Sequence, residues 1–256
     1  MENKAAPMRT VSIHQPECFP WLGFLDKASR SDVFVLLDCV QYVKGSFQNR
    51  NKLRTRRGWD WVTVPVAMRD RSTKLISEIE ISDGDGQRWR RKHLALWREN
   101  YRGARFAAPY LTFLEKLYAG SHRRLLDFNR EVIDWLFAQF EIKAEVRLAS
   151  QMRWQGAATE LNLSLCQDVG ADVYLSGISG RDYLDERRFK AAGIAVRYQE
   201  FHHPVYPQRF DPFVPGLSSL DLLFNHGPDA ARILRDPAAP RLDTLFAPAR
   251  LRADIA

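Results

Sequence analysis

The chain has 256 residues, of which 45% are hydrophobic and 27% charged, so it can bury the core of a globular protein. Its sequence has no apolar run of about 18 residues, which argues against a membrane-spanning helix. The first residues lack the apolar segment of a signal peptide, and three scattered cysteines argue against a disulfide framework. These features predict a cytoplasmic protein without membrane insertion. The net charge of +7 favours an anionic partner.

The first forty residues predict a βαβ unit. We expect a disordered leader over residues 1–8 and then a strand over 10–13. Pro20 is typical of a first helical turn, because its missing N–H would be unpaired there, and a short helix over 21–30 follows. The apolar run 33–37 is typical of a strand that is buried on both faces of a parallel sheet.

The middle of the chain predicts a strand pair followed by helices. Residues 59–66 alternate as a strand does, and 75–81 is expected to be its partner. Aromatic residues and a histidine recur every four positions from 89 to 101, which predicts a helix. Two more helices are expected over 109–118 and 122–140.

The last third of the sequence returns to alternating strands and helices, and it completes the predicted fold. Residues 229–256 are rich in Pro, Arg and Ala and predict a loosely attached tail. The predicted class is α/β, a Rossmann-like and mostly parallel sheet, as one domain over 9–228 with a helical insertion at about 87–140. We expect strands over 146–148, 172–176 and 194–201, and helices over 159–169 (capped by Gly170), 185–192 and 218–226.

Polar side chains follow the first two predicted strands. His14 and Gln15 come after the strand 10–13, and Asp38 ends the run 33–37. Ligands of open α/β sheets bind beyond the carboxyl ends of the strands, and imidazole titrates near neutrality. We therefore predict His14 as a catalytic acid or base, Gln15 as a ligand contact, and Asp38 as a catalytic partner. The structural alternatives are a histidine that pins the loop and an aspartate that caps a turn.

The segment 44–57 carries six Lys or Arg residues and no acid. A guanidinium binds phosphate through two parallel hydrogen bonds, and the amides that flank it can read hydroxyls or bases. Trp59 and Trp61 follow closely, and basic residues among aromatics also suit single-stranded nucleic acid. A solvated face is the alternative. The predicted substrate-binding residues in and before this segment are Gln41, Tyr42, Lys44, Asn49, Arg50 and Asn51.

A Gly/Ser-rich loop follows the predicted strand 172–176. The backbone amides of such a loop can cradle phosphate, although the loop has neither a Walker lysine nor the spacing of a dinucleotide fingerprint. Adjacent His202 and His203 would point opposite ways on a strand, so we predict no metal site, and the sequence names no cofactor. The substrate-binding residues predicted here are Ser176, Gly177, Ser179, Gly180 and Arg181.

Segments spread in order over residues 11–227 resemble the WbqC-like protein family. Cys39 stands where we would expect a second acid beside Asp38, which weakens a two-carboxylate metal site there. The matching residues are His14–Pro16, Pro20–Phe24, Lys27, Asp38, Val40–Tyr42, Asn49–Asn51, Trp61–Pro65, Tyr174–Gly177, Gly180, Tyr183, Leu184, Pro204, Tyr206, Gln208, Ser218, Asp221 and Leu222.

This resemblance implies a role in the biosynthesis of bacterial surface polysaccharides such as O-antigen, because members of the family appear in such gene sets. A fold-level likeness to nucleotidylyltransferase and class I synthetase-like domains is weaker. The second histidine of their HxGH signature is missing here, and Trp21–Phe24 stands in its place.

Two functions follow as hypotheses. The favoured one is an enzyme that transfers an acyl or aminoacyl group to an amino sugar on a nucleotide, with a nucleotide sugar or sugar phosphate as substrate and aminoacyl-tRNA as one conceivable donor. In it, Arg50 and the 176–181 loop would hold the diphosphate, and Asn49 and Asn51 the sugar. The rival is a non-catalytic protein that binds nucleic acid or nucleotide through the basic 44–57 segment.

Overall fold

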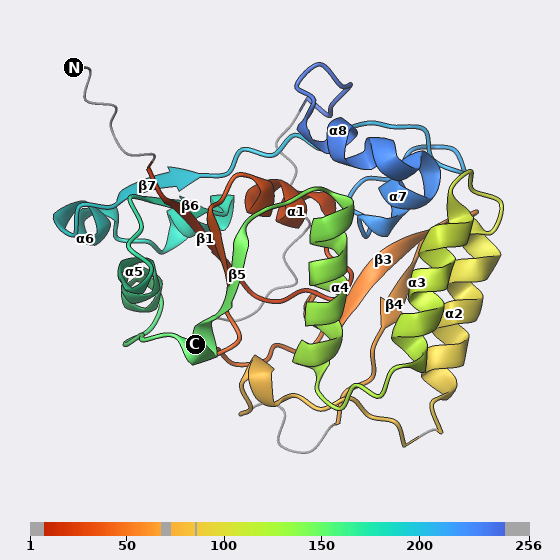
Figure 1. Cartoon of the computed structure of the whole chain (residues 1–256), viewed down its shortest axis with the longest axis horizontal. Helices are drawn as coiled ribbons and strands as arrows, with labels where there is room; N and C mark the ends of the chain where they lie inside the picture. The colour runs from red at the N-terminus through yellow and green to blue at the C-terminus, as the bar shows by residue number, and fades with distance from the viewer. Residues whose placement is uncertain (1–7, 68–72, 85, 244–256) are drawn as a thin grey trace. The chain divides into compact units, whose positions relative to one another are not determined.

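The computed structural model describes residues 8–67, 73–84 and 86–243 (Figure 1). The chain divides into two compact units that are built from interleaved segments. The sheet unit holds residues up to 15, 27–37 and 143–200, and the helical unit holds 16–26, 38–142 and the residues from 201 onward. Within the described residues, no helix is both long enough and apolar enough to cross a membrane. The predicted leader lies almost entirely outside the described residues.

The sheet unit is built on five parallel strands in the order β5-β2-β1-β6-β7. The prediction of an α/β fold with a mostly parallel sheet is therefore confirmed. Residues of β2 and β6 are buried throughout, which explains their unbroken apolar character. The strands are β1 (Thr10–His14), β2 (Val33–Leu36), β5 (Glu145–Leu148), β6 (Val173–Ser176) and β7 (Ala195–Tyr198).

The strand order has a switch point at its centre. From β1 the chain adds β2 and then β5 on one side, and it returns to place β6 and β7 on the other side of β1. Crevices at such reversals are where open α/β sheets bind ligands. The helices that join these strands include α1 (Leu22–Ser29), α5 (Thr159–Asp168) and α6 (Glu186–Ala191), and a 3-10 helix spans Ile178–Asp182. Gly170, just beyond α5, has a φ of +64°, which suits the predicted glycine cap.

The helical unit combines a two-stranded hairpin with a group of helices (Figure 1). Its core is aromatic: the Phe19 ring packs edge-on against Trp97 and Phe128, and Tyr101 stacks on Phe224 with 4.3 Å between ring centroids. The elements are β3 (Arg50–Thr55), β4 (Gly58–Thr63), α2 (Arg88–Tyr101), α3 (Ala107–Ala119), α4 (Leu125–Gln139), α7 (Leu220–His226) and α8 (Ala230–Arg235).

Two parts of this unit differ from what the sequence predicted. The partner of β4 is β3 rather than residues 75–81, which form a 3-10 turn over Ile76–Glu78 and a bridge from Ile81 to Val66. The strand β3 escaped notice because its buried residues include polar Asn51 and Arg54, which lie on opposite faces of the strand. The expected tail begins with α8, which buries Ala230, Ala231 and Leu234; residues 244–256 lie outside the described part.

The buried carboxylate of Asp221 organises the polar interior of the helical unit. It accepts hydrogen bonds from Tyr101 Oη at 2.9 Å, Tyr206 Oη at 3.0 Å and Gln208 Nε2 at 2.9 Å. The Tyr101 hydroxyl in turn accepts the Arg54 backbone N–H at 3.0 Å. Burial raises the pKa of the Asp221 carboxyl to about 6, although these hydrogen bonds favour the carboxylate. One side chain therefore joins α7, α2 and the loop that follows residue 201.

Removing one donor from this network should destabilise the protein. Tyr101→Phe leaves Asp221 short of a hydrogen bond and leaves the Arg54 N–H without an acceptor. We expect the free energy of unfolding to fall by about 1–3 kcal/mol in urea denaturation. Tyr183→Phe is the comparison: Tyr183 is 46% exposed and its hydroxyl accepts a longer bond, from Asn162 Nδ2 at 3.3 Å, which water can replace, so stability should fall by less than about 0.5 kcal/mol. Equal stability of the two variants would contradict a structural role for the network.

Candidate functional site at the sheet switch point

Three polar side chains lie at the carboxyl ends of β1 and β6 in the sheet unit. Two of them were predicted as site residues from the sequence, and the third is a lysine. His14 is the last residue of β1 and Ser176 the last of β6. Between them lies Lys27, a buried side chain of α1 whose Nζ donates to the Ile13 carbonyl at 3.0 Å. The same Nζ is 3.9 Å from where a Cβ on Gly177 would be. A buried ammonium group thus stands at the switch point, where it favours anionic ligands.

His14 is held as a neutral imidazole of defined tautomer. Its Nδ1 lies 2.9 Å from the Gln15 carbonyl oxygen. Because a carbonyl only accepts, Nδ1 carries the proton and Nε2 carries the lone pair. Burial and the charge of Lys27 together lower the pKa of His14 to about 3, although the hydrogen bond to Gln15 acts in the opposite direction. At neutral pH the ring can therefore accept a proton at Nε2, and a nearby anion would make it a stronger base.

The loop after β6 is tightly packed against its own strand. The Ser176 hydroxyl donates to the Gly177 carbonyl at 3.1 Å. A Cβ on Gly180 would lie 2.2 Å from Ser176 Oγ, so only glycine fits this close approach. Ser179 is half-buried. The Arg181 guanidinium lies over the Tyr198 ring at 4.9 Å and 3.9 Å from Glu200, so contacts with β7 and the residues after it hold this predicted phosphate ligand.

The other predicted catalytic residue, Asp38, belongs to the helical unit. It is fully buried, and its carbonyl accepts the Ser77 N–H at 3.0 Å. The pairing of His14 with Asp38 stays a prediction. Burial, with the charge of Asp38, raises the pKa of the neighbouring Cys39 thiol to about 11, so this thiol is not an activated nucleophile. Nearby, Gln41 and Lys44 are exposed and Tyr42 is buried.

The predicted amide ligands around Arg50 turn inward. Asn49 Nδ2 donates to the Val64 carbonyl at 2.9 Å, and Asn51 Nδ2 donates to the Phe19 carbonyl at 2.8 Å. Both side chains are buried, so these bonds fix the start of β3. Arg50 donates to the Gly45 carbonyl and lies 4.1 Å from the centroid of the Trp61 ring. Of the six basic residues, Arg54 is also buried, because it donates to four backbone carbonyls.

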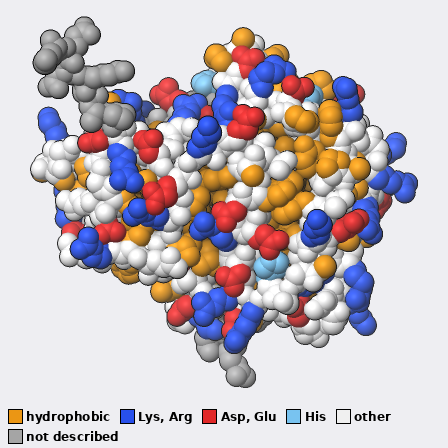
Figure 2. All heavy atoms as spheres, viewed as in Figure 1, with side chains coloured by type: hydrophobic (Ala, Val, Ile, Leu, Met, Phe, Trp, Pro, Cys, Tyr) orange, Lys and Arg blue, Asp and Glu red, His pale blue; other side chains and the backbone are white. Residues whose placement is uncertain are grey.

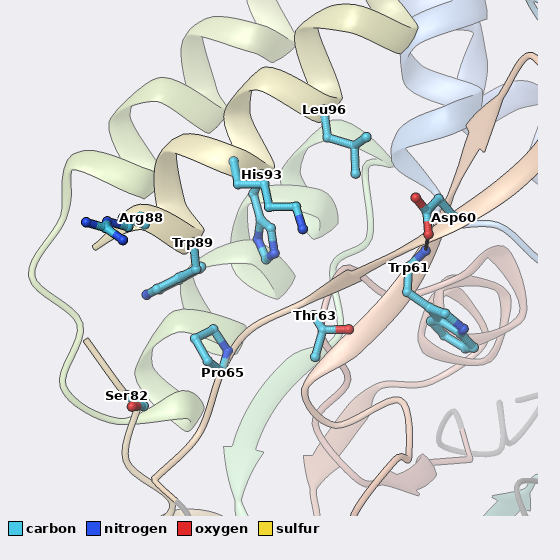
Figure 3. Close-up of a pocket in the computed structure, with 10 residues that line it drawn as sticks. Asp60, Trp61, Thr63, Pro65, Ser82, Arg88, Trp89, His93 and Leu96 are labelled. Carbon is cyan, nitrogen blue, oxygen red and sulfur yellow. Dashed lines mark hydrogen bonds between the residues drawn. The ribbon is translucent and has the colours of Figure 1, made fainter. Parts of the chain in front are cut away.

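A pocket of about 560 Å³ lies between β4 and the first half of α2 in the helical unit (Figure 3). Asp60, Thr63 and Pro65 line one side, and Arg88 and His93 line the other (Figure 3). His93 is not poised for acid–base work near pH 7. Burial lowers its pKa to about 4, and its Nδ1 lies 3.3 Å from Tyr118 Oη. Among the residues that the structure describes, no three His, Cys, Asp or Glu side chains are placed to hold a metal ion.

Sequence reasoning missed Lys27 and the pocket as site features. In the sequence Lys27 appeared as one of the residues that match the family, and its contact with the Ile13 carbonyl could not be foreseen from the sequence. The periodicity of Trp89 and His93 indicated a buried helix face but not the hollow beside it. Basic and acidic side chains are interspersed over the face shown in Figure 2, so the net positive charge does not gather there.

Comparisons with known proteins give a family and one curated relative. The model of the WbqC-like protein family matches residues 15–233. An uncharacterized protein of Mycobacterium tuberculosis, Rv1507c, is 33% identical over 230 residues, which is 89% of this chain and 98% of that protein. No solved structure matches the chain significantly. The match begins one residue after β1, and it covers β2, β5, β6, β7 and most of the helical unit. The chain belongs to the WbqC-like protein family.

Proposed function

We propose that the protein is an enzyme of surface-polysaccharide biosynthesis that transfers an acyl or aminoacyl group to an amino sugar carried on a nucleotide. The observation that carries this proposal is the buried ammonium of Lys27, set between the Ile13 carbonyl and Gly177. An ammonium at the switch point of a parallel sheet favours a phosphate of the nucleotide. Membership of the family supports the metabolic setting.

The Gly/Ser-rich loop supports the same ligand. Backbone N–H groups in a loop of this composition can surround a phosphate, and Gly177 presents no side chain toward Lys27. The phosphate would then lie close to His14. Because a negative charge favours the imidazolium form, ligand binding would raise the low pKa of His14 toward neutrality. The nucleotide would thus activate its own general base.

The proposed reaction forms one amide bond. The neutral amine of the sugar attacks the acyl carbonyl carbon, and the bond from that carbon to the donor's leaving group breaks. His14 Nε2 accepts the proton that the amine loses, and it passes this proton to the leaving group. The lone pair on Nε2 that this step needs is a consequence of the Nδ1 contact with Gln15.

The influence of Lys27 on His14 can be measured directly. Lys27→Met removes a positive charge beside the imidazole, so the pKa of His14 should rise above its value of about 3, while burial keeps it below that of a free histidine. A titration followed by NMR of the ring protons measures it. The control is Lys190→Met on exposed α6, which should leave His14 unchanged. If the pKa of His14 is the same in the wild type and in both variants, the charge of Lys27 does not act on the His14 imidazole.

Turnover tests the proposed role of His14. Unlabelled amino-sugar nucleotides are incubated with acyl-coenzyme A or aminoacyl-tRNA donors, and amide products are detected by mass spectrometry. His14→Gln should lower the rate by about 10²–10⁴-fold, as loss of a general base does, with a melting temperature near that of the wild type. Lys27→Met should instead weaken nucleotide binding by about tenfold, a loss of about 1.4 kcal/mol.

The His14→Gln and Lys27→Met variants can also contradict the proposed function. A His14→Gln protein that melts early but turns over normally would assign His14 to the structure. Nucleotide binding that is the same in Lys27→Met and Lys190→Met would remove the phosphate from the switch point. Titration calorimetry of each variant with a nucleotide sugar measures the second effect separately from chemistry.

A further inference from the structure

The outward face of the β3–β4 hairpin alternates cations with aromatic rings. On this face the register sets Arg50 opposite Thr63 and Lys52 opposite Trp61, whereas Arg54, opposite Trp59, is buried. Arg50 Cζ lies 4.1 Å from the Trp61 ring centroid, and Lys52 Nζ lies 4.4 Å from the Trp59 centroid. Such contacts are attractive because the ring face carries negative charge density.

The alternation continues around the hairpin turn. The Phe210 ring has the Arg56 guanidinium at 5.7 Å and the Arg209 guanidinium at 5.1 Å. Each residue of this set belongs to the helical unit. We call the set the cation–aromatic row, and it consists of Arg50, Lys52, Arg56, Trp59, Trp61 and Phe210.

The row is positively charged and open to ligands. Asp60 is the one acidic residue in the sequence between 44 and 66, against six basic residues. Burial, and then the charge of Arg50, lower the pKa of Lys52, so these two cations repel each other. A bound anion would relieve this repulsion. Trp59 is 44% exposed although Lys52 covers part of it, so ring surface remains for a ligand.

We propose that the cation–aromatic row binds single-stranded nucleic acid, with bases on Trp59 and Trp61 and phosphates at the neighbouring cations. A row of this kind meets both requirements of such ligands, since every base has a stacking face and every linkage has a charge. The two tryptophan rings pack edge-to-face, with 5.4 Å between their centroids and 81° between their planes, so they offer stacking faces in two directions. The proposal concerns the helical unit alone and does not depend on the proposed transferase activity.

The structure separates two kinds of residue in the basic segment that the sequence alone did not distinguish. The segment 44–57 combines residues that hold the fold with residues that face outward. The side chains of Arg54, Asn49 and Asn51 donate hydrogen bonds to backbone carbonyls and so hold the fold. The nucleic-acid contacts therefore fall to Lys52 and Arg56, to the part of the Arg50 guanidinium that does not donate to the Gly45 carbonyl, and to rings outside the segment.

The experiment measures binding of a fluorescein-labelled oligouridine and an oligothymidine of twelve nucleotides to the full chain by anisotropy, at several salt concentrations. Affinity should fall steeply with salt, by a logarithmic slope of about 0.7 for each phosphate contact. Trp59→Ala should weaken binding about tenfold. Trp154→Ala is the matched control, because Trp154 is 41% exposed and lies in the sheet unit, and it should bind as the wild type does.

Charge and stacking are separated by two further measurements. Lys52→Ala should reduce the salt slope by about 0.7, whereas Lys143→Ala, an exposed lysine of the sheet unit, should not. Dextran sulfate, a polyanion without bases, should bind Trp59→Ala and the unaltered protein equally. In the unaltered protein, saturating oligothymidine should quench tryptophan fluorescence, which requires no variant to fold.

Three results would overturn the inference. The first is equal binding by Trp59→Ala and Trp154→Ala. The second is a loss of dextran sulfate binding as large as the loss of oligouridine binding in Trp59→Ala, since the tryptophan would then not act by stacking. The third is the absence of both anisotropy change and fluorescence quenching with the unaltered protein at low salt.

Discussion

The polar interior of the helical unit depends on one shared hydrogen-bond acceptor, the buried Asp221 carboxylate. Through Tyr101 it reaches the backbone of β3, and through Tyr206 and Gln208 it reaches the loop that precedes α7. Arg54 of β3 also binds that same loop, since it donates to the carbonyls of Phe210 and Pro212. A buried polar group without a partner costs about 1–3 kcal/mol, so these residues specify one arrangement of hairpin, helix and loop. The pocket beside α2 and the outward face of the hairpin both depend on it.

Much of the fold follows from local patterns in the sequence. The apolar run 33–37 predicted a strand buried on both faces, and the structure places β2 inside a parallel sheet. The helices of the middle region follow from periodicity. The strand β3 did not, because the partners that make Asn51 and Arg54 suitable for burial are the carbonyls of Phe19 and Phe210, far away in the sequence. A strand whose inward side chains are polar can be recognised only once those distant carbonyls are known.

The candidate site shows the same division. The positions of His14 and Ser176 at strand ends could be predicted, since strands end where apolar runs end. The importance of Lys27 could not, because a lysine in an amphipathic helix reads as solvent-facing until the helix is packed on β1. Likewise, the sequence predicted one basic surface over 44–57. In the structure, some of these side chains donate to backbone carbonyls and others belong to the cation–aromatic row.

The interleaving of the two units has a consequence for biosynthesis. The chain passes between them after residues 15, 26, 37, 142 and 200. The first strand, β1, pairs with β6, which is more than 150 residues later. The ribosome must therefore release almost the whole chain before the sheet can close around its own central strand. Until then the apolar edge of β1 is exposed, and a nascent chain stalled before β6 would be a natural client for chaperones.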